Sequence, residues 1–217
     1  MKLILHNSVS IDGSLTGFEA NMGLHYQLAA SYKPDAHLIG SNTVTAGIEM
    51  YGEGVPDEEV SDFMKPERNS NLPYWIIPDT EGSLKGILHT CRRFEFCRDV
   101  ILLISETTPA EYIRHLEERN YDFLISGKVK VDYNVAFKLL SKKYNTHTIL
   151  ADTGKVLGNI LLNAQLVDEI SMLIHPVLTG AGAYPMFSDI HHPIQFKLLK
   201  SEMLENEFVW IKYKMIK

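Results

Sequence analysis

Cysteine is scarce in this chain of 217 residues, where Cys91 and Cys97 are the only two. Two cysteines cannot build the disulfide framework of a small secreted domain, so reduced thiols in the cytoplasm are expected. Long apolar runs are also missing, and none approaches the about 18 residues that a membrane-spanning helix needs. At the N-terminus the apolar run Leu3–Leu5 is too short for a signal peptide. These absences predict a cytoplasmic protein with no membrane partner.

Excess positive charge is absent as well. Lysine and arginine number 21 against 27 aspartate and glutamate residues, which gives a formal net charge of -6. A chain with this balance lacks the basic field that nucleic-acid binding needs. Hydrophobic residues make up 45% of the chain, enough to fill a core, and the length favours a single domain over residues 1–217. We therefore expect one globular domain whose partner is a small molecule.

Strand patterns alternate with helix patterns along most of the chain. Apolar segments predict strands at 3–11, 36–39, 74–77, 100–104, 121–125, 148–150 and 169–175. Helical spacing predicts helices at 22–32, 109–119, 133–144 and 156–164, and two strands, 195–199 and 208–215, follow without a helix. This order predicts an α/β fold of three layers with a mixed, mainly parallel sheet and a C-terminal antiparallel addition. The acidic segment 51–71 is interpreted as a surface excursion, either a lid or a solvated insertion.

Four of the predicted strands end in short turns of small and polar residues, at 40–43, 78–80, 126–128 and 152–155. Ligands of open α/β sheets bind at the carboxyl ends of the strands. Two of these turns lead directly into a helix, whose free N–H groups and positive dipole end suit phosphate. The alternative is that the glycines in these turns serve only the strand–helix junctions.

Several common fingerprints are missing. The dinucleotide fingerprint G-x-G-x-x-G does not occur, since Gly182 is followed by Ala-Tyr-Pro, and Gly154-Lys155 lacks the rest of a P-loop. The G-x-S-x-G elbow of hydrolases is also missing. His89, Cys91 and Cys97 match no zinc spacing, so no metal is expected. Nearby arginines would lower the pKa of the Cys97 thiol, which leaves a reactive cysteine as an alternative.

Taken together, the turns resemble a known family. Val9-Ser10-Ile11-Asp12-Gly13 is similar to an S-(L/I)-D-G first strand, and Leu38–Val44 is similar to a G-x-x-T turn. The longest similarity covers Ile149–Leu162 and continues through L-V-D-E at 166–169 and P-V-L-x-G-x-G at 176–182. These segments resemble the dihydrofolate-reductase-like family, and most closely its riboflavin-biosynthesis reductases, the RibD C-terminal domains.

The resemblance implies an NADPH-dependent reductase, commonly a homodimer, with a pyrimidine or pterin-type substrate. The most similar substrates are 5-amino-6-(5-phosphoribosylamino)uracil and the related diaminopyrimidine ribosylamine phosphate. By position, the adenylate-side phosphates would meet Gly40, Ser41, Asn42 and Thr43, and the adenosine end would meet Pro78 and Asp79. Ser126 and Gly127, at a further strand end, would also contact the cofactor. The pyrophosphate turn would comprise Thr153, Gly154, Lys155, Val156 and Leu157.

The chain also departs from the family pattern. The family has a Glu followed by glycines at the pyrophosphate turn, whereas this chain has Asp152 and Thr153. The first helix lacks the carboxylate that a folate reductase places there, so a dihydrofolate reductase-like enzyme is disfavoured. The missing features motivate a second hypothesis, a nucleotide-binding protein on the same scaffold without turnover.

In the reductase hypothesis, hydride reaches an imine carbon and the protein positions the imine and supplies a proton. The candidate catalytic groups are Asp152, Asp12, Glu19 and His25. Each has a structural alternative: Asp152 as a helix cap, Asp12 as a turn residue, and the other two as solvated or packed side chains.

Overall fold

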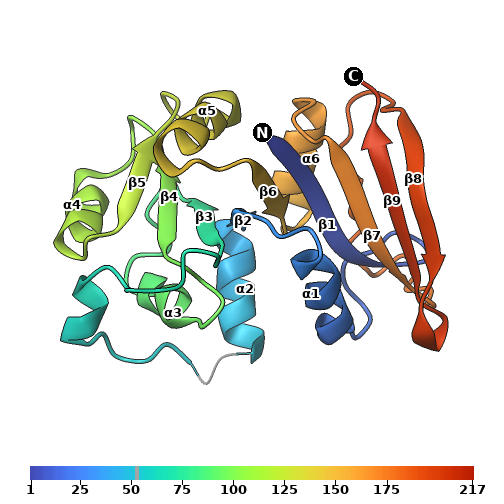
Figure 1. The fold of residues 1–217 in the computed structure, drawn as a ribbon, viewed down its shortest axis with the longest axis horizontal. Helices are drawn as coiled ribbons and strands as arrows, with labels where there is room; N and C mark the ends of the chain where they lie inside the picture. Colours follow the sequence, from blue (N-terminus) through green and yellow to red (C-terminus); the bar gives the residue numbers. More distant parts are fainter. Residues whose placement is uncertain (52–53) are drawn as a thin grey trace. The chain divides into compact units, whose positions relative to one another are not determined.

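The computed structural model describes residues 1–51 and 54–217 and divides the chain into two compact units (Figure 1). The middle unit comprises Asp35–His147 together with Met1, and the terminal unit comprises Lys2–Pro34 and Thr148–Lys217. Each unit is described by itself below. The expectation of one domain over residues 1–217 stays a prediction.

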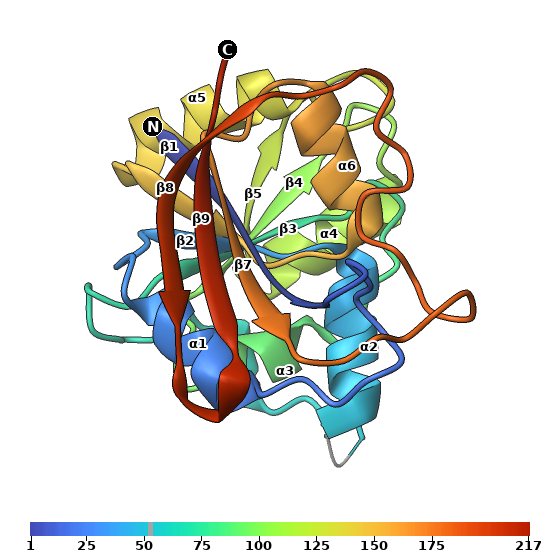
Figure 2. The same cartoon turned by 90° about the vertical axis from the view of Figure 1, so that its right-hand side faces the viewer.

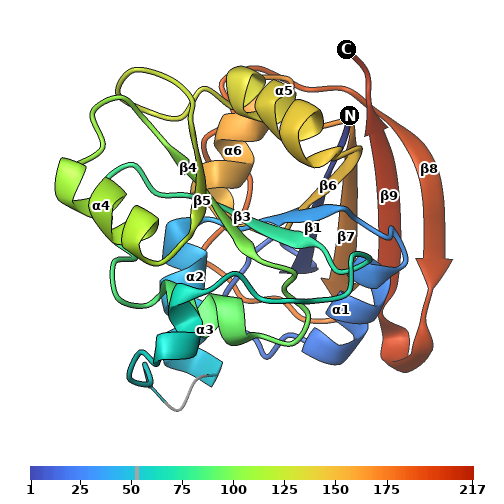
Figure 3. The same ribbon diagram turned by 60° about the vertical axis from the view of Figure 1, so that its left-hand side comes forward.

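The middle unit is a parallel α/β unit. Its strands are parallel and lie side by side in the order β5-β4-β3-β2, with bounds β2 (Ala36–Leu38), β3 (Tyr74–Pro78), β4 (Val100–Ile104) and β5 (Asp122–Ile125). Its helices are α2 (Ser41–Tyr51), α3 (Leu88–Arg93), α4 (Ala110–Glu118) and α5 (Tyr133–Tyr144). Because neighbouring strands follow in chain order, right-handed crossovers place α2, α3 and α4 on one face. Figure 3 shows α5 on the opposite side of these strands from α2 and α3.

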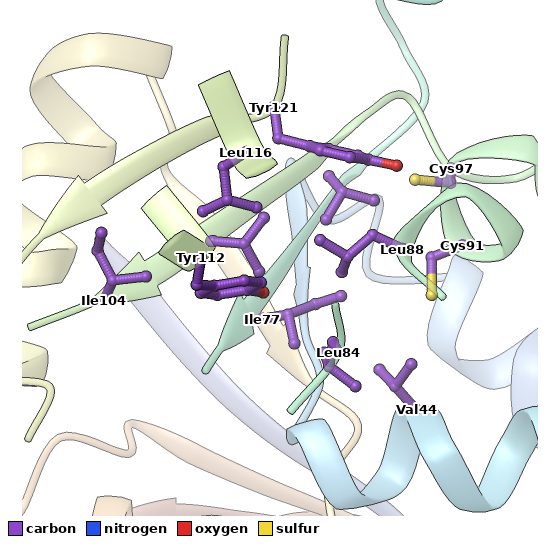
Figure 4. Close-up of a cluster of buried hydrophobic side chains, with 12 residues drawn as sticks. Val44, Ile77, Leu84, Leu88, Cys91, Cys97, Ile104, Tyr112, Leu116 and Tyr121 are labelled. Atoms are coloured by element: carbon purple, nitrogen blue, oxygen red, sulfur yellow. The ribbon is translucent and has the colours of Figure 1, made fainter. Parts of the chain in front are cut away.

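Apolar side chains fill the space between these strands and the helices on the first face. β4 is buried along its whole length, as its sequence of consecutive apolar residues predicts for a strand covered on both faces. Val44 of α2, Leu88 of α3 and Leu116 of α4 belong to one core cluster (Figure 4). Burying one such side chain contributes about 1.5–3 kcal/mol. This packing fixes the positions of the strand ends.

Both cysteines belong to the same core (Figure 4). Cys91 and Cys97 are free thiols and are buried. Burial raises the pKa of Cys91 to about 12 and moves the pKa of Cys97 upward as well. The alternative of a reactive Cys97 is therefore wrong, because desolvation of the thiolate outweighs the effect of the arginines nearby.

Arginines fasten the acidic segment to the middle unit. Around the short 3₁₀ helix η1 (Val60–Phe63), Arg93 Nε donates to Asp62 Oδ1 at 2.9 Å, and Asp62 is 5% exposed. Arg119 binds both carboxylate oxygens of Glu58, at 2.7 and 2.6 Å. These contacts argue against a freely moving lid, and most of the described residues of the segment are exposed, as expected for a surface excursion. Residues 52 and 53 of the predicted excursion lie outside the described residues.

The terminal unit adds the predicted antiparallel strands. β6 (Thr148–Ala151), β1 (Lys2–Ser10) and β7 (Glu169–His175) are parallel neighbours. β9 (Val209–Met215) is antiparallel to β7, and β8 (Phe196–Met203) pairs with β9 across a turn that contains η2 (Glu205–Glu207). Figure 2 shows this long hairpin beside β7. The predicted fold class, α/β with mainly parallel strands and a C-terminal antiparallel addition, is confirmed.

Two helices cover opposite faces of the terminal unit's strands. α1 (Met22–Ala30) packs through Ala29 against Ile4 of β1 and Leu150 of β6. α6 (Lys155–Asn163) approaches the other face, where Gly158 lies beside the side chain of Leu5. Successive residues of a strand face opposite sides, so this alternation places residues 4, 6 and 8 of β1 under α1. In the described part of the chain, no helix is long and apolar enough to cross a membrane.

Candidate active site

Two of the predicted catalytic residues meet beneath α1. His25 is buried on α1, and its Nε2 lies 3.3 Å from Oδ2 of Asp152, which directly follows β6. The other ring nitrogen, Nδ1, lies 3.1 Å from the hydroxyl oxygen of Ser8 on β1. The strand register explains this contact. Leu5 pairs with Ala151, so the next residue, Asp152, lies beside His6, which is on the face of β1 that α1 covers. The structure thus joins His25 and Asp152 at the carboxyl end of β6.

The chemistry of the ring nitrogens follows from their partners. Nε2 lies 3.3 Å from Asp152 Oδ2 but forms no hydrogen bond with the described residues, and because a carboxylate only accepts, a proton on Nε2 suits this neighbour better than a lone pair does. With the proton on Nε2, Nδ1 accepts a hydrogen bond from the Ser8 hydroxyl. Asp152 has 22% of its side chain exposed, whereas only 3% of His25 is exposed. The arrangement can therefore hold a proton at a defined atom and present it at a partly open carboxylate.

Sequence reasoning missed His6, which lies next to this pair. The two imidazole rings of His6 and His25 have centroids 4.4 Å apart. His6 has no exposed surface, and burial, with a smaller contribution from His25, lowers its pKa from 6.5 to about 4. The available signal was a histidine that directly follows three apolar residues, Leu3–Leu5, in a predicted strand, because a buried polar side chain requires partners.

The carboxylate of Asp12, a predicted catalytic group, is bound within the protein. Its carboxylate accepts hydrogen bonds from Ser10 Oγ at 2.5 Å and from the backbone N–H of Gly180 at 2.9 Å. Thr179 also donates to it through its hydroxyl. These bonds, that of Ser10 first, hold the pKa of Asp12 well below its usual range, which makes it a poor proton donor. The turn interpretation of Asp12 fits the structure. Glu19 is exposed, as a solvated residue would be.

The predicted pyrophosphate turn lies at the start of α6. Gly154 is the N-cap of α6, so the alternative interpretation of Asp152 as the helix cap is wrong. No side chain among the described residues caps this helix, which leaves its first N–H groups suited to an anion. Thr153 is 2% exposed and its carbonyl accepts a hydrogen bond from Asn7 Nδ2 at 2.9 Å, so its side chain lies within the protein.

The three remaining residues of this turn differ in what they expose. Lys155 places its ammonium nitrogen 4.1 Å from the ring centroid of Tyr184. Val156 is exposed, whereas the side chain of Leu157 is buried, so Leu157 offers only its backbone to a ligand.

The other predicted cofactor residues belong to the middle unit. Its parallel strands place the turns after β2, β3 and β5 at one edge of its sheet. Gly40 precedes α2, which begins at Ser41 and continues through Asn42 and Thr43. Ser126 is buried, and Gly127 has a φ of +99°.

Asp79 is occupied within the protein. Its Oδ1 accepts from the backbone N–H groups of Gly82 and Ser83, and its Oδ2 accepts from that of Leu84. Asp79 is 3% exposed, so it shapes the turn after Pro78 and β3 rather than presenting a free carboxylate. The predicted direct contact of Asp79 with adenosine does not fit this geometry.

Residues 1–210 match the family described as the RibD C-terminal domain. The chain belongs to this family. The family predicted from the sequence motifs is thereby confirmed.

Individual relatives are distant. The chain is 28% identical over 136 residues to the uncharacterized protein YyaP of Bacillus subtilis, an alignment that covers 63% of this chain and 61% of YyaP. A pyrimidine reductase-like protein from Corynebacterium diphtheriae has a TM-score of 0.73 at 18% identity, over 100% of this chain and 92% of the other.

Two riboflavin-pathway proteins share the fold as well. The riboflavin biosynthesis reductase Rib7 of Saccharomyces cerevisiae has a TM-score of 0.67 at 17% identity, over 99% of this chain and 90% of Rib7. RibD of Acinetobacter baumannii has a TM-score of 0.69 at 20% identity, with 99% of this chain covered. The matched region is 58% of that RibD chain, so the chain spans little more than half its length.

Proposed function

We propose that this protein is an NADPH-dependent reductase of a pyrimidine ribosylamine phosphate, most similar to 5-amino-6-(5-phosphoribosylamino)uracil. The observation that carries the proposal is the pair of His25 Nε2 and Asp152 Oδ2, 3.3 Å apart at the carboxyl end of β6. Membership of the RibD C-terminal domain family supports the reaction class. The substrate and the choice of NADPH over NADH are parts of the proposal.

One helix start in each unit suits a phosphate group. Gly40–Thr43 would offer backbone N–H groups at the start of α2, and Gly154 and Lys155 would do so at the start of α6. When bound, the cofactor supplies the hydride. Asp152 would hold the substrate's nitrogen at its partly exposed carboxylate. When the imine is reduced, Asp152 would pass a proton from solvent to the nitrogen at its partly exposed carboxyl group, and His25 Nε2–H would face the carboxylate that remains, with the Ser8 hydroxyl keeping the ring in that tautomer.

Loss of cofactor absorbance on a panel of substrates tests the proposal. The panel contains the phosphorylated pyrimidine ribosylamine, its dephosphorylated form and dihydrofolate, each with NADPH and with NADH. We expect consumption of NADPH with the phosphorylated pyrimidine. Absence of consumption on every substrate would refute the reductase.

Matched substitutions test the site. Asp152→Asn and His25→Gln should each lower kcat by about 10²–10⁴-fold while the cofactor still binds. The exposed residues Glu117 and His192 offer the controls Glu117→Gln and His192→Gln, which should keep wild-type kcat. An unchanged kcat in Asp152→Asn would remove that residue from the mechanism.

A nucleotide-binding protein without turnover is the competing hypothesis. It was motivated by Thr153 in the pyrophosphate turn, but the burial of Thr153 removes its side chain from the path of a ligand. Tight NADPH binding without consumption on the whole panel would favour this hypothesis. Failure to bind NADPH at all would refute both.

We also propose a homodimer in the cytoplasm. The sheet of the terminal unit ends at β8, where Leu198, Leu199 and Met203 are 52%, 46% and 82% exposed. Apolar side chains on a long edge strand favour pairing with another chain. Light scattering of the wild type should give the mass of two chains, and Leu198→Glu should lower it to one. A monomeric wild type would refute the dimer, and recovery in a membrane fraction would refute the location.

A further inference from the structure

A buried chain of hydrogen bonds runs beneath α1 from β9 to β1. Trp210 Nε1 donates to the hydroxyl oxygen of Ser171 at 2.9 Å. The same oxygen lies 2.9 Å from Nδ1 of His6, and Nε2 of His6 lies 3.1 Å from the backbone carbonyl oxygen of His25. Ser171 and His6 have no exposed surface, and Trp210 is 7% exposed.

The direction of each bond in this chain is fixed by chemistry. An indole N–H only donates, so the Ser171 oxygen accepts from Trp210 and its own hydrogen is free to bind His6 Nδ1. A backbone carbonyl only accepts, so the hydrogen on His6 lies on Nε2 and points at the His25 carbonyl. His6 therefore has one tautomer, with Nδ1 unprotonated. A second proton on Nδ1 would reverse the bond with Ser171, whose oxygen would then accept from both Trp210 and His6.

The surroundings of His6 favour the same neutral state. Burial lowers its pKa to about 4, His25 acts in the same direction, and Asp152 opposes both. The ionisable groups that surround this ring and its neighbours are His25 and Tyr32 on α1 and just beyond it, Asp152 after β6, Glu169 on β7 and Lys212 on β9. His6 is therefore neutral at neutral pH.

We propose that His6 is a positioning residue for the His25–Asp152 pair and that it acts as the neutral Nε2–H tautomer. Its bond to the His25 carbonyl fixes the first turn of α1, and its ring, inclined by 36° to that of His25, limits how far the latter can rotate. Nε2 of His25 is thereby held toward Asp152. This inference rests on the proposed function, since the pair is assigned there as the proton-holding group.

Three substitutions of His6 separate positioning from packing. The amide nitrogen of glutamine reaches the place of Nε2, so His6→Gln keeps the bond to the His25 carbonyl. The side-chain oxygen of asparagine takes the place of Nδ1, so His6→Asn keeps only the bond to Ser171. His6→Leu keeps neither. Ile4→Val is the packing control, because Ile4 contacts α1 through Ala29 without a polar contact.

We expect kcat to fall about tenfold to 100-fold in His6→Leu and His6→Asn, with KM for NADPH within about twofold of wild type. His6→Gln should recover kcat to within about threefold, and Ile4→Val should keep it. Equal losses in the glutamine and leucine variants would overturn the proposal, as would an unchanged kcat in His6→Leu.

A measurement on the wild-type protein is independent of turnover. The ¹⁵N shifts of the His6 ring should report Nε2–H and an unprotonated Nδ1 from about pH 8 to about pH 5.5. Titration of His6 in that range, or the Nδ1–H tautomer, would overturn the proposal. If no substrate consumes NADPH but these shifts are found, the proposed function has failed while the geometry of the hydrogen-bond chain stands.

Discussion

Replacing Gly127 by alanine should destabilise the protein far more than the same change at Gly86. Both glycines have positive φ, +99° and +83°. A Cβ built on Gly127 would lie 2.1 Å from the backbone oxygen of Lys130 and 2.9 Å from the backbone nitrogen of Asp132. At Gly86 no described atom lies within 4 Å of the added Cβ. The pair separates backbone strain from steric collision.

The expected loss of folding free energy depends on which atoms the added Cβ displaces. An L-residue at positive φ costs about 1–2 kcal/mol at either position. At Gly127 the loop must also shift, which disturbs the 2.8 Å bond from Asp132 N to the carbonyl of Ser126, worth about 1 kcal/mol. Asp132 is the N-cap of α5, where its side chain accepts hydrogen bonds from the backbone N–H groups of Asn134 and Val135. Loss of that cap costs about 1 kcal/mol more. We expect a loss of about 3–4 kcal/mol for Gly127→Ala and about 1–2 kcal/mol for Gly86→Ala.

Urea unfolding followed by circular dichroism measures both losses. Gly127 was also predicted to contact the cofactor, so NADPH binding is measured at a urea concentration where both variants are folded. Equal losses of stability at the two glycines would refute the collision argument. A loss of NADPH affinity without loss of stability in Gly127→Ala would show that the residue serves the ligand rather than the loop.

Three further predictions concern His6, the cysteines and Asp12. Between pH 6.5 and about pH 4 an unfolded His6 binds a proton that the folded residue does not, so acidification should remove about 3 kcal/mol of stability, and urea unfolding of His6→Gln should lack this share. An equal acid loss in both proteins would contradict the buried neutral histidine. Ellman's reagent should label Cys91 and Cys97 only after unfolding, because both thiols are buried; rapid labelling of the native protein would contradict it. Asp12→Asn should weaken the contact with residues 179–180 and speed proteolysis there, and an unchanged cleavage rate would show that these bonds stabilise little.

Much of the fold could be predicted because the decisive signals are local. The apolar residues of β4 indicate a strand covered on both faces, and the alternation of Ile211, Tyr213 and Met215 indicates a half-buried strand. The short helix α3 was not predicted. It has six residues, no side-chain cap, and buries polar His89 and Arg92 beside its apolar residues, so it lacks a clear helical period.

The candidate site could be predicted only in part. The motif that contains Asp152 is visible in the sequence, and His25 stands out because its helix has no other histidine and no charged residue. Their meeting depends on the register of β1 against β6 and on the packing of α1, which are long-range features that no local pattern contains. The roles of Asp12 and Asp79 could not be predicted for a similar reason. A carboxylate at a strand end can bind a ligand or stabilise its own loop, and the choice depends on which backbone N–H groups the folded chain places beside it.

The buried polar chain under α1 supports the placement of the chemistry there. The middle unit also buries charged groups, but Arg92 donates to Asp99 at 2.9 Å and Asp79 accepts from three backbone N–H groups, so these groups hold elements and turns together. The α1 face of the terminal unit instead buries His6, Ser171 and His25, although satisfied polar groups in a core contribute little net stability compared with packed apolar ones. Local departures from the most stable choice are expected where residues serve a function. The hydrogen-bond chain from Trp210 through Ser171 and His6 is a departure of this kind, because it ends at the backbone carbonyl of His25, whose side chain faces Asp152.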